Sequence, residues 1–464
     1  MKTRATKSKP AKSRSVRAAS ARQTDLSAAA IARFERRRAT VGVVGLGYVG
    51  LPLVRAMHDA GFTVVGYDID ATKIDMLKKG QAYLKHLGVE LVRHLAASPR
   101  FTPTTNAKAL AKCDAIAICV PTPLGKHDEP DLSYVEHSTR MIAGVLKRGA
   151  LVSLESTTYP GTTRELCLPI LEAGGRRCGR DFFLAFSPER EDPGRKGVNT
   201  REIPRLVGGI DDASTKVAAA MYRAAIERVH EVESAEVAEA AKILENTYRA
   251  VNIALVNELK PVLADMGIDI WQVIEAASTK PFGFQAFYPG PGLGGHCIPI
   301  DPYYLTYKAR EFGHVTRFIE LAGLVNRRMP RYVVDRTAEA LNDAGLPMRG
   351  AKVLVVGIAY KPNIDDVRET PAAEIIELLA DRGAIVSFHD PHVGVFPRMR
   401  KYDIPLKSLP LNAGNLHQCD AVVIVTDHAA VDWALIGREA GLVVDTRNVM
   451  AKVKGRIRAR VVKA

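Results

Sequence analysis

The sequence predicts an α/β protein with two doubly wound, Rossmann-like domains joined by a long central helix. Two observations carry this prediction. Short apolar strands alternate with helical segments in two separate stretches of the chain. Between these stretches, an almost uninterrupted helical pattern covers about 234–266. At 464 residues, the chain is also longer than one hydrophobic core usually supports, which favours several domains.

The net charge is concentrated at the two ends of the chain. Residues 1–38 carry +10 and residues 451–464 carry +6 of a formal total of +14, so the body between them carries −2. We therefore expect a basic disordered tail at 1–38 and a basic C-terminal tail at 451–464. Such tails imply at most weak attraction to polyanions, and no specific nucleic-acid partner is expected.

The N-terminal tail lacks the apolar run of a secretory signal, although its composition overlaps that of organellar transit peptides. No stretch approaches the roughly 18 apolar residues of a membrane span. The six cysteines show no CxxC pair and no His/Cys cluster, so free thiols and no metal site are expected. These features favour a cytoplasmic protein without membrane insertion.

The first folded domain, expected at 39–230, opens with a dinucleotide-binding fingerprint. A strand over 40–44 leads into the turn that contains Gly45, Gly47 and Gly50, and a helical pattern follows. The first glycine permits the turn, the second permits close approach of a pyrophosphate, and the third permits helix–strand packing. The N–H groups at the start of the helix can bind the pyrophosphate. The alternative is a tight turn with an unrelated glycine pattern.

A second strand over 62–67 ends at Asp68, which lies 23 residues after Gly45. A carboxylate at this position accepts hydrogen bonds from the ribose hydroxyls and repels a 2′-phosphate. The spacing therefore favours NAD over NADP.

Three further strands, at 115–120, 151–154 and 182–186, end next to polar residues. The residues after these strands are Pro121, Thr122, Ser156, Thr157 and Glu189. In open α/β sheets, ligands bind at this edge. The serine and threonine side chains could instead cap helices, and Glu189 could instead form an ion pair with Arg190 or Arg195.

A central helical domain, expected at 231–345, contains a glycine-rich loop with a lone cysteine, Cys297, and a carboxylate, Asp301, four positions later. The glycines of this loop allow the backbone to approach a ligand closely, which makes the cysteine a candidate nucleophile. A free cysteine can equally be a small buried hydrophobe. The glycines are Gly290, Gly292, Gly294 and Gly295.

In the long helical pattern, Lys242 and Asn246 have i, i+4 spacing and lie on one face. Spacing alone favours a surface pair. Pro261 lies near the far end of the pattern and predicts a kink or a break.

A second doubly wound domain is expected at 346–450, with strands at 351–357, 385–389, 421–425 and 442–445. Gly357 follows the first of these strands without the remaining glycines of the fingerprint. The pattern leaves open whether this domain binds a different nucleotide or none.

Over residues 39–450, these motifs resemble the UDP-glucose/GDP-mannose dehydrogenase family. The branch that acts on UDP-N-acetylhexosamines, UDP-N-acetylglucosamine above all, is the most similar. The segments that carry the resemblance are Ser187–Arg190, Thr247–Glu258, Ser278–Phe284 and Phe287–Tyr304.

The resemblance implies a four-electron oxidation of the C6 hydroxyl of a nucleotide sugar by two NAD molecules, for surface polysaccharide synthesis. It implies that Cys297 forms a thiohemiacetal and then a thioester. Lys242 and Asn246 would stabilise the oxyanion, and Asp301 would polarise water. Thr157 and Glu189 would hold that water or relay protons.

The resemblance also implies binding roles. Lys361 would contact the substrate, Arg447 the UDP, Lys73 the adenosine end of NAD and Arg368 its diphosphate. Pairing through the long helix implies a homodimer or a larger homo-oligomer. The remaining cofactor-binding residues would be Gly45, Gly47, Tyr48, Val49, Gly50, Asp68, Pro121, Thr122 and Ser156. The remaining substrate-binding residues would be Glu189, Lys242, Asn246, Phe287, Tyr288, Gly290 and Gly294.

Two departures from the sugar-dehydrogenase pattern concern the substrate. His296 replaces a serine and Ile300 replaces a lysine, which argues against UDP-glucose and for an N-acetylated sugar. The spacing cannot distinguish UDP-N-acetylglucosamine from UDP-N-acetylgalactosamine or UDP-N-acetylmannosamine. The competing class is a catalytically inactive nucleotide-sugar-binding protein.

Overall fold

The computed structural model describes residues 26–84, 87–125, 127–190, 200–295, 297–399 and 401–464. The chain forms two compact units. The first contains the described residues up to 125 and residues 130–242, and the second contains residues 127–129 and the described residues from 243 onward.

The first unit contains an eight-stranded sheet with the strand order β3-β2-β1-β4-β5-β6-β7-β8. Neighbouring strands are parallel except for β6 and β7. The chain order reverses between β1 and β4, and ligands bind at such a switch point in open sheets. The strands are β1 (Thr40–Val44), β2 (Thr63–Tyr67), β3 (Phe101–Thr104), β4 (Ala115–Ile118), β5 (Leu151–Leu154), β6 (Phe183–Phe186), β7 (Arg205–Gly209) and β8 (Val229–Glu231).

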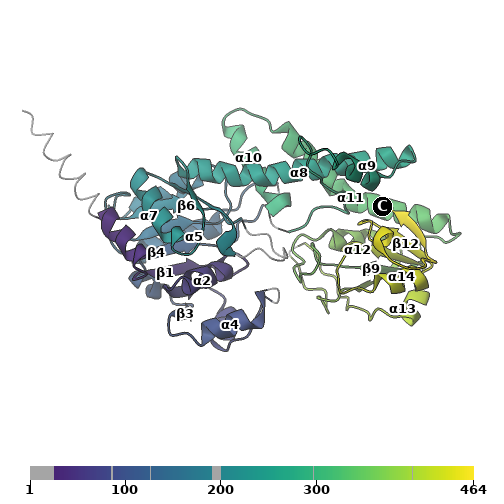
Figure 1. Cartoon of the computed structure of the whole chain (residues 1–464), viewed down its shortest axis with the longest axis horizontal. Coiled ribbons are helices and arrows are strands. Elements are labelled where there is room, and N and C mark those ends of the chain that lie inside the picture. The colour runs from purple at the N-terminus through teal and green to yellow at the C-terminus, as the bar shows by residue number, and fades with distance from the viewer. Residues whose placement is uncertain (1–25, 85–86, 126, 191–199, 296, 400) are drawn as a thin grey trace, which may run out of the picture. The chain divides into compact units, whose positions relative to one another are not determined.

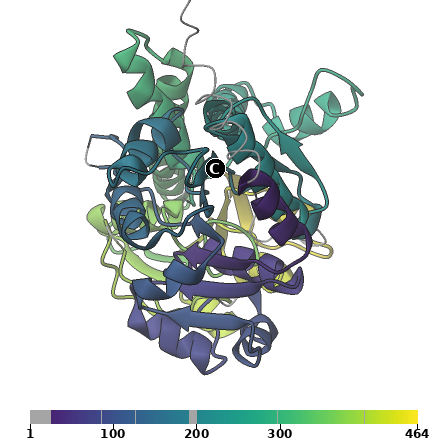
Figure 2. The same ribbon diagram turned by 90° about the vertical axis from the view of Figure 1, so that its left-hand side faces the viewer.

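This sheet is buried on both faces, as expected for a doubly wound fold. Val41 and Val43 of β1 belong to one apolar cluster, whereas Val44 belongs to a second. Figure 2 shows this unit from the side that is on the left in Figure 1. Its helices are α2 (Gly50–Asp59), α3 (Ala71–Lys78), α4 (Val89–Ala96), α5 (Ser133–Val145), α6 (Leu168–Glu172) and α7 (Asp212–Arg223).

The second unit contains a five-stranded parallel sheet with the order β10-β9-β11-β12-β13. Here the switch point lies between β9 and β11. The strands are β9 (Lys352–Val356), β10 (Ile385–His389), β11 (Ala421–Ile424), β12 (Leu442–Asp445) and β13 (Arg460–Lys463). The helices that precede or cover this sheet are α9 (Ile270–Ala277), α10 (Cys297–Glu311), α11 (Arg317–Asn342), α12 (Pro371–Asp381), α13 (Ala413–His417) and α14 (Trp433–Glu439).

The long central helix is α8 (Ala235–Asp265), which has 31 residues and continues from the first unit into the second (Figure 1). Pro261 lies inside this helix. The helix therefore continues past the proline without a break, and the alternative expectation of a kink stays a prediction. The predicted α/β class with two Rossmann-like sheets and a long helix is confirmed.

The prediction of a disordered tail is wrong for part of residues 1–38. Residues 26–35 form a helix, whereas residues 1–25 lie outside the described part of the chain. The helix is held to the first unit because the Phe34 ring is buried edge-on against Phe62, with centroids 6.4 Å apart. Arg33 also pairs with Asp114.

The prediction of a C-terminal tail at 451–464 is also wrong at its end, because β13 pairs with β12. The charges of Arg460 and Lys463 flank Val461 and Val462, and edge strands commonly carry such charges. In the described residues, no helix combines the length and the apolar character needed to cross a bilayer.

Candidate active site

The glycine turn after β1 has room for side chains at only one of its three fingerprint positions. Gly45 has φ +91°, and a Cβ there would lie 2.6 Å from the carbonyl oxygen of Cys119. A Cβ at Gly50 would lie 1.8 Å from the carbonyl oxygen of Gly45. A Cβ at Gly47 would meet no atom within 4 Å. Gly45 and Gly50 therefore serve the turn itself, and Gly47 faces open space that a ligand can approach.

The carboxylate of Asp68 is buried and supports this turn. Its Oδ2 accepts a hydrogen bond from the Leu46 N–H at 2.8 Å and pairs with Lys73 Nζ at 3.3 Å. Its Oδ1 accepts from the Asp70 N–H at 3.0 Å. The residue expected at the ribose thus also fixes the backbone between the first two glycines. Lys73, expected at the adenosine end of the cofactor, lies beside this carboxylate.

The ends of β4 and β5 lie beside the glycine turn, because β4 pairs with both β1 and β5. Ser156 donates its hydroxyl hydrogen to the carbonyl oxygen of Val120 at 2.7 Å, which ties the two strand ends together. Pro121 is exposed, Thr122 is buried and Thr157 is half-buried.

The residues at this edge fit a dinucleotide. Tyr48 and Val49 are half-buried in the turn, and α2 starts at Gly50 with its first N–H groups directed toward the turn. The open space at Gly47 is the feature of the structure that supports this fit.

A buried charged network that the sequence reasoning missed lies behind Glu189. Arg205, on β7, is 5% exposed and pairs with Glu155. Its Nη1 lies 3.7 Å from Glu189 Oε2, and its Nε donates to Ser187 Oγ at 3.0 Å. Tyr222 donates to the other oxygen of Glu155 at 2.6 Å. Burial raises the pKa of Glu155 to about 7, and the guanidinium charge of Arg205 opposes this shift.

Glu189 lies near two arginines of the described residues. Its Oε1 accepts from the main-chain N–H of Arg190 at 2.6 Å, and its Oε2 lies 3.7 Å from Arg205 Nη1. Arg195 lies outside the described residues. The available signal was an arginine at the start of the otherwise apolar strand Arg205–Gly209, since a charge in a strand covered on both faces requires a partner.

The side chain of Lys242 reaches the main chain of Glu189. The Lys242 side chain is buried, and its Nζ donates a hydrogen bond to the main-chain oxygen of Glu189. Both residues belong to the first unit.

In the second unit, Asn246 and Asp301 form a buried pair. Asn246 Nδ2 donates to Asp301 Oδ2 at 2.6 Å, and the residues are 3% and 4% exposed. Cys297 is exposed and is the first residue of α10, whereas the sequence suggested a loop. Asp301 follows one turn later on the same helix, about 6 Å along its axis. The thiol and the carboxylate therefore lie on one helix face. His296 lies outside the described residues.

The glycine-rich segment before α10 packs closely against the second sheet. A Cβ at Gly290 would lie 2.7 Å from Arg447 Nη1, and the Gly290 N–H donates to Asn257 Oδ1 at 2.9 Å. The Phe287 ring contacts the Tyr248 ring edge-on, with centroids 5.7 Å apart.

The next turn of this segment contacts the loop that contains Lys361. A Cβ at Gly294 would lie 2.5 Å from the Cβ of Tyr360. The Gly295 N–H donates to the main-chain oxygen of Arg368 at 2.9 Å. The Arg368 guanidinium forms a fork with the Asp366 carboxylate, with N–O distances of 2.7 and 3.0 Å. The arginine expected at the cofactor diphosphate is thus held by a carboxylate of its own unit.

Lys361 and Arg447 follow β9 and β12, which both pair with β11. In a parallel sheet, the carboxyl ends of these strands meet at one edge. Arg447 Nε donates to the Val425 carbonyl oxygen at 2.8 Å, which orients the guanidinium there. Tyr288 is about half exposed. The segments that follow these two strands therefore carry one cationic residue each at this edge.

Comparisons with known proteins agree with this arrangement. Models of the UDP-glucose/GDP-mannose dehydrogenase family match the chain in three stretches: its NAD-binding domain at 39–226, its central domain at 236–328 and its UDP-binding domain at 354–452.

Individual relatives cover nearly the whole chain. A UDP-N-acetyl-D-glucosamine 6-dehydrogenase of Pseudomonas aeruginosa is 38% identical, over 84% of this chain and 90% of its own. The solved UDP-N-acetyl-D-mannosamine dehydrogenase of Pyrococcus horikoshii has a TM-score of 0.81 and 33% sequence identity. The match covers 91% of this chain and 98% of the solved one. A UDP-glucose dehydrogenase structure from Pyrobaculum islandicum has a TM-score of 0.80 and 29% sequence identity, and the match covers 92% of this chain and 97% of that structure. The chain therefore belongs to the UDP-glucose/GDP-mannose dehydrogenase family and is an NAD-dependent oxidoreductase of nucleotide sugars.

Proposed function

We propose that the protein oxidises the C6 hydroxyl of UDP-N-acetyl-D-glucosamine to a carboxylate through a covalent intermediate on Cys297. One observation supports this proposal above the others. An exposed thiol and a buried, hydrogen-bonded carboxylate lie one turn apart at the start of α10. A thiol can capture an aldehyde, and a nearby carboxylate can activate the water that releases the acid.

The first stage converts the alcohol to the aldehyde. Asp301 accepts the hydroxyl proton through a water molecule. The ammonium group of Lys242 and the amide of Asn246, one turn apart on α8, stabilise the developing negative charge on the oxygen. A donor in such a position contributes about 3–4 kcal/mol in comparable sites.

The second stage takes place on sulfur. The Cys297 thiolate adds to the aldehyde carbon, and the resulting thiohemiacetal loses a hydride to become a thioester. Water activated by Asp301 attacks the thioester carbon, which releases the carboxylate and restores the thiol. Covalent capture retains the reactive aldehyde between the two oxidations.

NAD, when bound, accepts one hydride in each oxidation, so one alcohol, two NAD⁺ and one water give one carboxylate, two NADH and three protons. We assign its pyrophosphate to the turn of Gly45, Gly47 and Gly50, and its adenosine ribose to Asp68 with Lys73 beside it. The ends of β4 and β5 complete this set with Pro121, Thr122 and Ser156.

The second unit would hold the UDP moiety. Lys361 and Arg447 supply positive charge at one edge of its sheet, and Gly290 allows the glycine-rich segment to pass directly over Arg447. Phe287, Tyr288 and Gly294 lie on that same segment and would contact the nucleotide sugar.

The choice of sugar has support from sequence alone. The relatives above carry names with three different sugars, and the segment around Cys297 resembles the N-acetylhexosamine branch. Oxidation of UDP-N-acetylmannosamine, UDP-N-acetylgalactosamine or UDP-glucose by the same chemistry is the alternative.

A substrate panel separates these possibilities. Each of the four UDP-sugars is supplied with NAD, and NADH formation is followed by absorbance together with acid formation by mass spectrometry. We expect the highest kcat/KM with UDP-N-acetylglucosamine and two NADH for each sugar consumed. A higher value with another sugar would reassign the substrate. One NADH for each sugar would contradict oxidation to the acid, and no NADH from any sugar would indicate a binding protein without activity.

We further propose that α8 pairs two copies of this chain. Six large apolar residues of α8 are each at least 41% exposed, and their spacing places them on one face. These residues are Val237, Leu244, Tyr248, Leu255, Leu259 and Val262. Light scattering should show a dimer or larger species that dissociates in Leu255→Glu. Arg249→Gln, on another exposed face of α8, should leave it intact. A monomeric wild-type chain would refute the pairing.

A further inference from the structure

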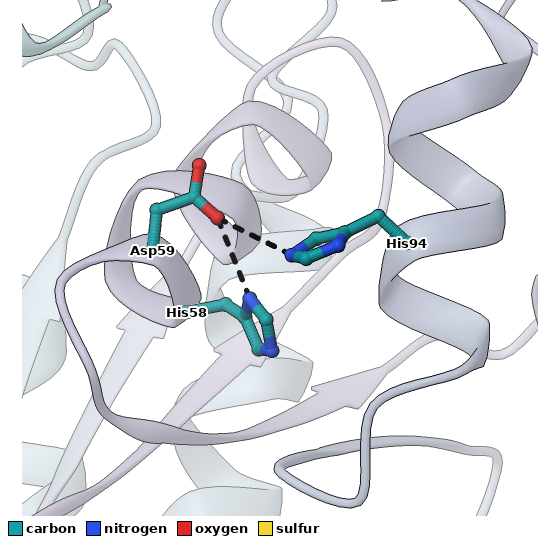
Figure 3. Close-up of side chains that lie close together, drawn as sticks. All are labelled: His58, Asp59 and His94. Atoms are coloured by element: carbon teal, nitrogen blue, oxygen red, sulfur yellow. Dashed lines mark hydrogen bonds and ion pairs between the residues drawn. The ribbon is translucent and has the colours of Figure 1, made fainter.

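A cluster of two histidines and an aspartate lies in the first unit, where α2 ends beside α4 (Figure 3). His58 Nδ1 lies 3.5 Å from Asp59 Oδ1, and His94 Nε2 lies 3.8 Å from the same oxygen. All three candidate ligand atoms lie within 4.8 Å of one another. The oxygen therefore faces both imidazole rings at once.

These separations are close to those of a metal centre. Tetrahedral ligands at 2.0–2.1 Å from a zinc ion are about 3.3 Å apart. The His94 side chain is 65% exposed, so it has the freedom to close the remaining gap. The two rings are nearly perpendicular, with an interplanar angle of 83° and centroids 5.2 Å apart. Stacking does not explain the convergence of their nitrogens on one carboxylate oxygen.

The atoms that do not face the cluster have other partners. His58 Nε2 lies 2.7 Å from Ser98 Oγ, and Asp59 Oδ2 accepts from Arg55 Nε at 3.4 Å. A histidine that donates one ring N–H to an oxygen presents the lone pair of its other nitrogen, and this arrangement is common around metal-bound histidines. Two ligands of the cluster are thus oriented by neighbouring groups.

The His58 ring is 1% exposed, and a metal ion binds a histidine ring in its neutral form. In the tautomer that carries the hydrogen on Nε2, the lone pair of Nδ1 faces the carboxylate oxygen of Asp59 at 3.5 Å, and a cation between the two atoms removes their repulsion.

We propose that His58, Asp59 and His94 bind one divalent transition-metal cation, with Zn²⁺ favoured by the two imidazoles and one carboxylate. Three protein ligands leave one coordination position for water. The sequence predicted no metal site because cysteine and histidine spacing did not reveal this cluster. It forms only when α4 brings His94 beside the end of α2.

The position within the fold indicates what the cation would do. The glycine turn lies at the start of α2, whereas His58 and Asp59 end it, about 14 Å along the helix axis. The cation is therefore too distant to take part in oxidation. It would join α2 to α4 and stabilise the NAD-binding domain.

The test uses the tag-free, full-length protein after removal of metal with a chelator. Co²⁺ is titrated while the visible spectrum is recorded, because its absorption bands report the ligands. We expect one Co²⁺ per chain with nitrogen and oxygen ligands, displaced by Zn²⁺, and a melting temperature that rises with added Zn²⁺. His94→Gln and Asp59→Asn should each weaken the Kd at least about tenfold. Both replacements are at exposed positions, so folding should persist.

His417→Gln is the matched control. His417 is an exposed histidine 3.0 Å from the Glu439 carboxylate, and no second histidine of the described residues completes a three-ligand cluster with them, so its loss should leave Co²⁺ binding unchanged. NAD affinity should be the same with and without Zn²⁺. A Co²⁺ spectrum with the near-ultraviolet charge-transfer band of a thiolate ligand would refute the proposal, because the metal would then be bound to a cysteine. Binding by His94→Gln at the wild-type Kd, or no binding by the wild type, would refute it equally.

Discussion

Asn246 Nδ2 donates a hydrogen bond of 2.6 Å to Asp301 Oδ2, and this bond joins α8 to α10 inside the second unit. Asp301 is 4% exposed, so few water molecules can replace the amide. A buried acceptor that loses its donor costs the folded state about 1–3 kcal/mol. The Asn246 amide therefore has two proposed roles: it holds the base Asp301 in place, and it stabilises the oxyanion.

We expect Asn246→Ala to lower kcat by about 10²–10³-fold, because removal of one oxyanion donor has that effect in comparable enzymes. Its free energy of unfolding should fall by about 1–3 kcal/mol. Asn252→Ala is the control, since Asn252 is half-buried on α8 and donates within its own helix, to the oxygen of Tyr248. Steady-state kinetics and denaturant titration measure both effects. Wild-type kcat in Asn246→Ala would exclude the oxyanion role.

The glycine turn predicts two different outcomes for the same substitution. Gly47→Ala should fold as stably as the wild type, because its Cβ meets no atom within 4 Å, but it should bind NAD at least tenfold more weakly. Gly50→Ala should lower the melting temperature, because its Cβ would lie 1.8 Å from the Gly45 oxygen. Calorimetric titration with NAD and thermal unfolding distinguish the two. Unchanged NAD affinity in Gly47→Ala would remove the pyrophosphate from this turn.

Replacement of Lys260 should stabilise the folded protein, and the size of this effect should depend on pH. Its side chain is 3% exposed, and within the described residues its Nζ makes no hydrogen bond. Burial lowers its pKa to about 7, although the Trp271 ring lies 4.8 Å from the ammonium. At pH 7, Lys260→Met should raise the free energy of unfolding by about 1–3 kcal/mol, because an apolar chain needs no partner.

The sign of the pH effect follows from that lowered pKa. Between pH 7 and the usual lysine pKa, the unfolded chain holds a proton that the folded chain has released, so wild-type stability rises with pH. The advantage of Lys260→Met should therefore shrink as pH increases above 7. Lys280→Met, at an exposed lysine near Phe282, should show neither effect. An advantage that grows with pH would contradict the assignment.

Removal of the Cys297 thiol should sharply reduce formation of the acid product. Cys297→Ser should lower the rate of acid formation by at least about 10³-fold, since a hydroxyl replaces the nucleophile. NAD affinity should be unchanged, because the glycine turn lies in the other unit. Cys419→Ser, at a half-buried free thiol, should retain activity. Product analysis by mass spectrometry measures the outcome, and full activity in Cys297→Ser would refute the covalent route.

The sequence predicted the features that depend on local pattern. The glycine fingerprint, the strand that ends at Asp68 and the long helix through Lys242 and Asn246 all have a periodicity or a spacing of their own. Three strands of the first sheet were missed. β3 contains a proline, β7 begins with a buried arginine, and β8 has only 3 residues. The helical state of Cys297 was missed because glycines precede it and two prolines follow it closely.

Long-range partners could not be predicted. Arg205 reaches Glu155 and Glu189 across three strands, and spacing along the chain carries no record of that contact. Phe34 is buried within a segment whose composition is basic and polar. In each case the two partners are far apart in the sequence and lie close together only in the folded chain.

The most direct test of the account is covalent capture in Asp301→Asn. The variant keeps the thiol but lacks the carboxylate that acts in both stages. It is therefore supplied with NAD and the C6 aldehyde of UDP-N-acetylglucosamine, which bypasses the first oxidation, and the thioester should accumulate because its hydrolysis is blocked. Intact-protein and peptide mass spectrometry should then show the oxidised nucleotide sugar attached to Cys297 and to no other cysteine. The Cys297→Ser/Asp301→Asn double variant should show no adduct. If Asp301→Asn turns over NAD yet never carries the sugar on Cys297, the proposed mechanism is wrong.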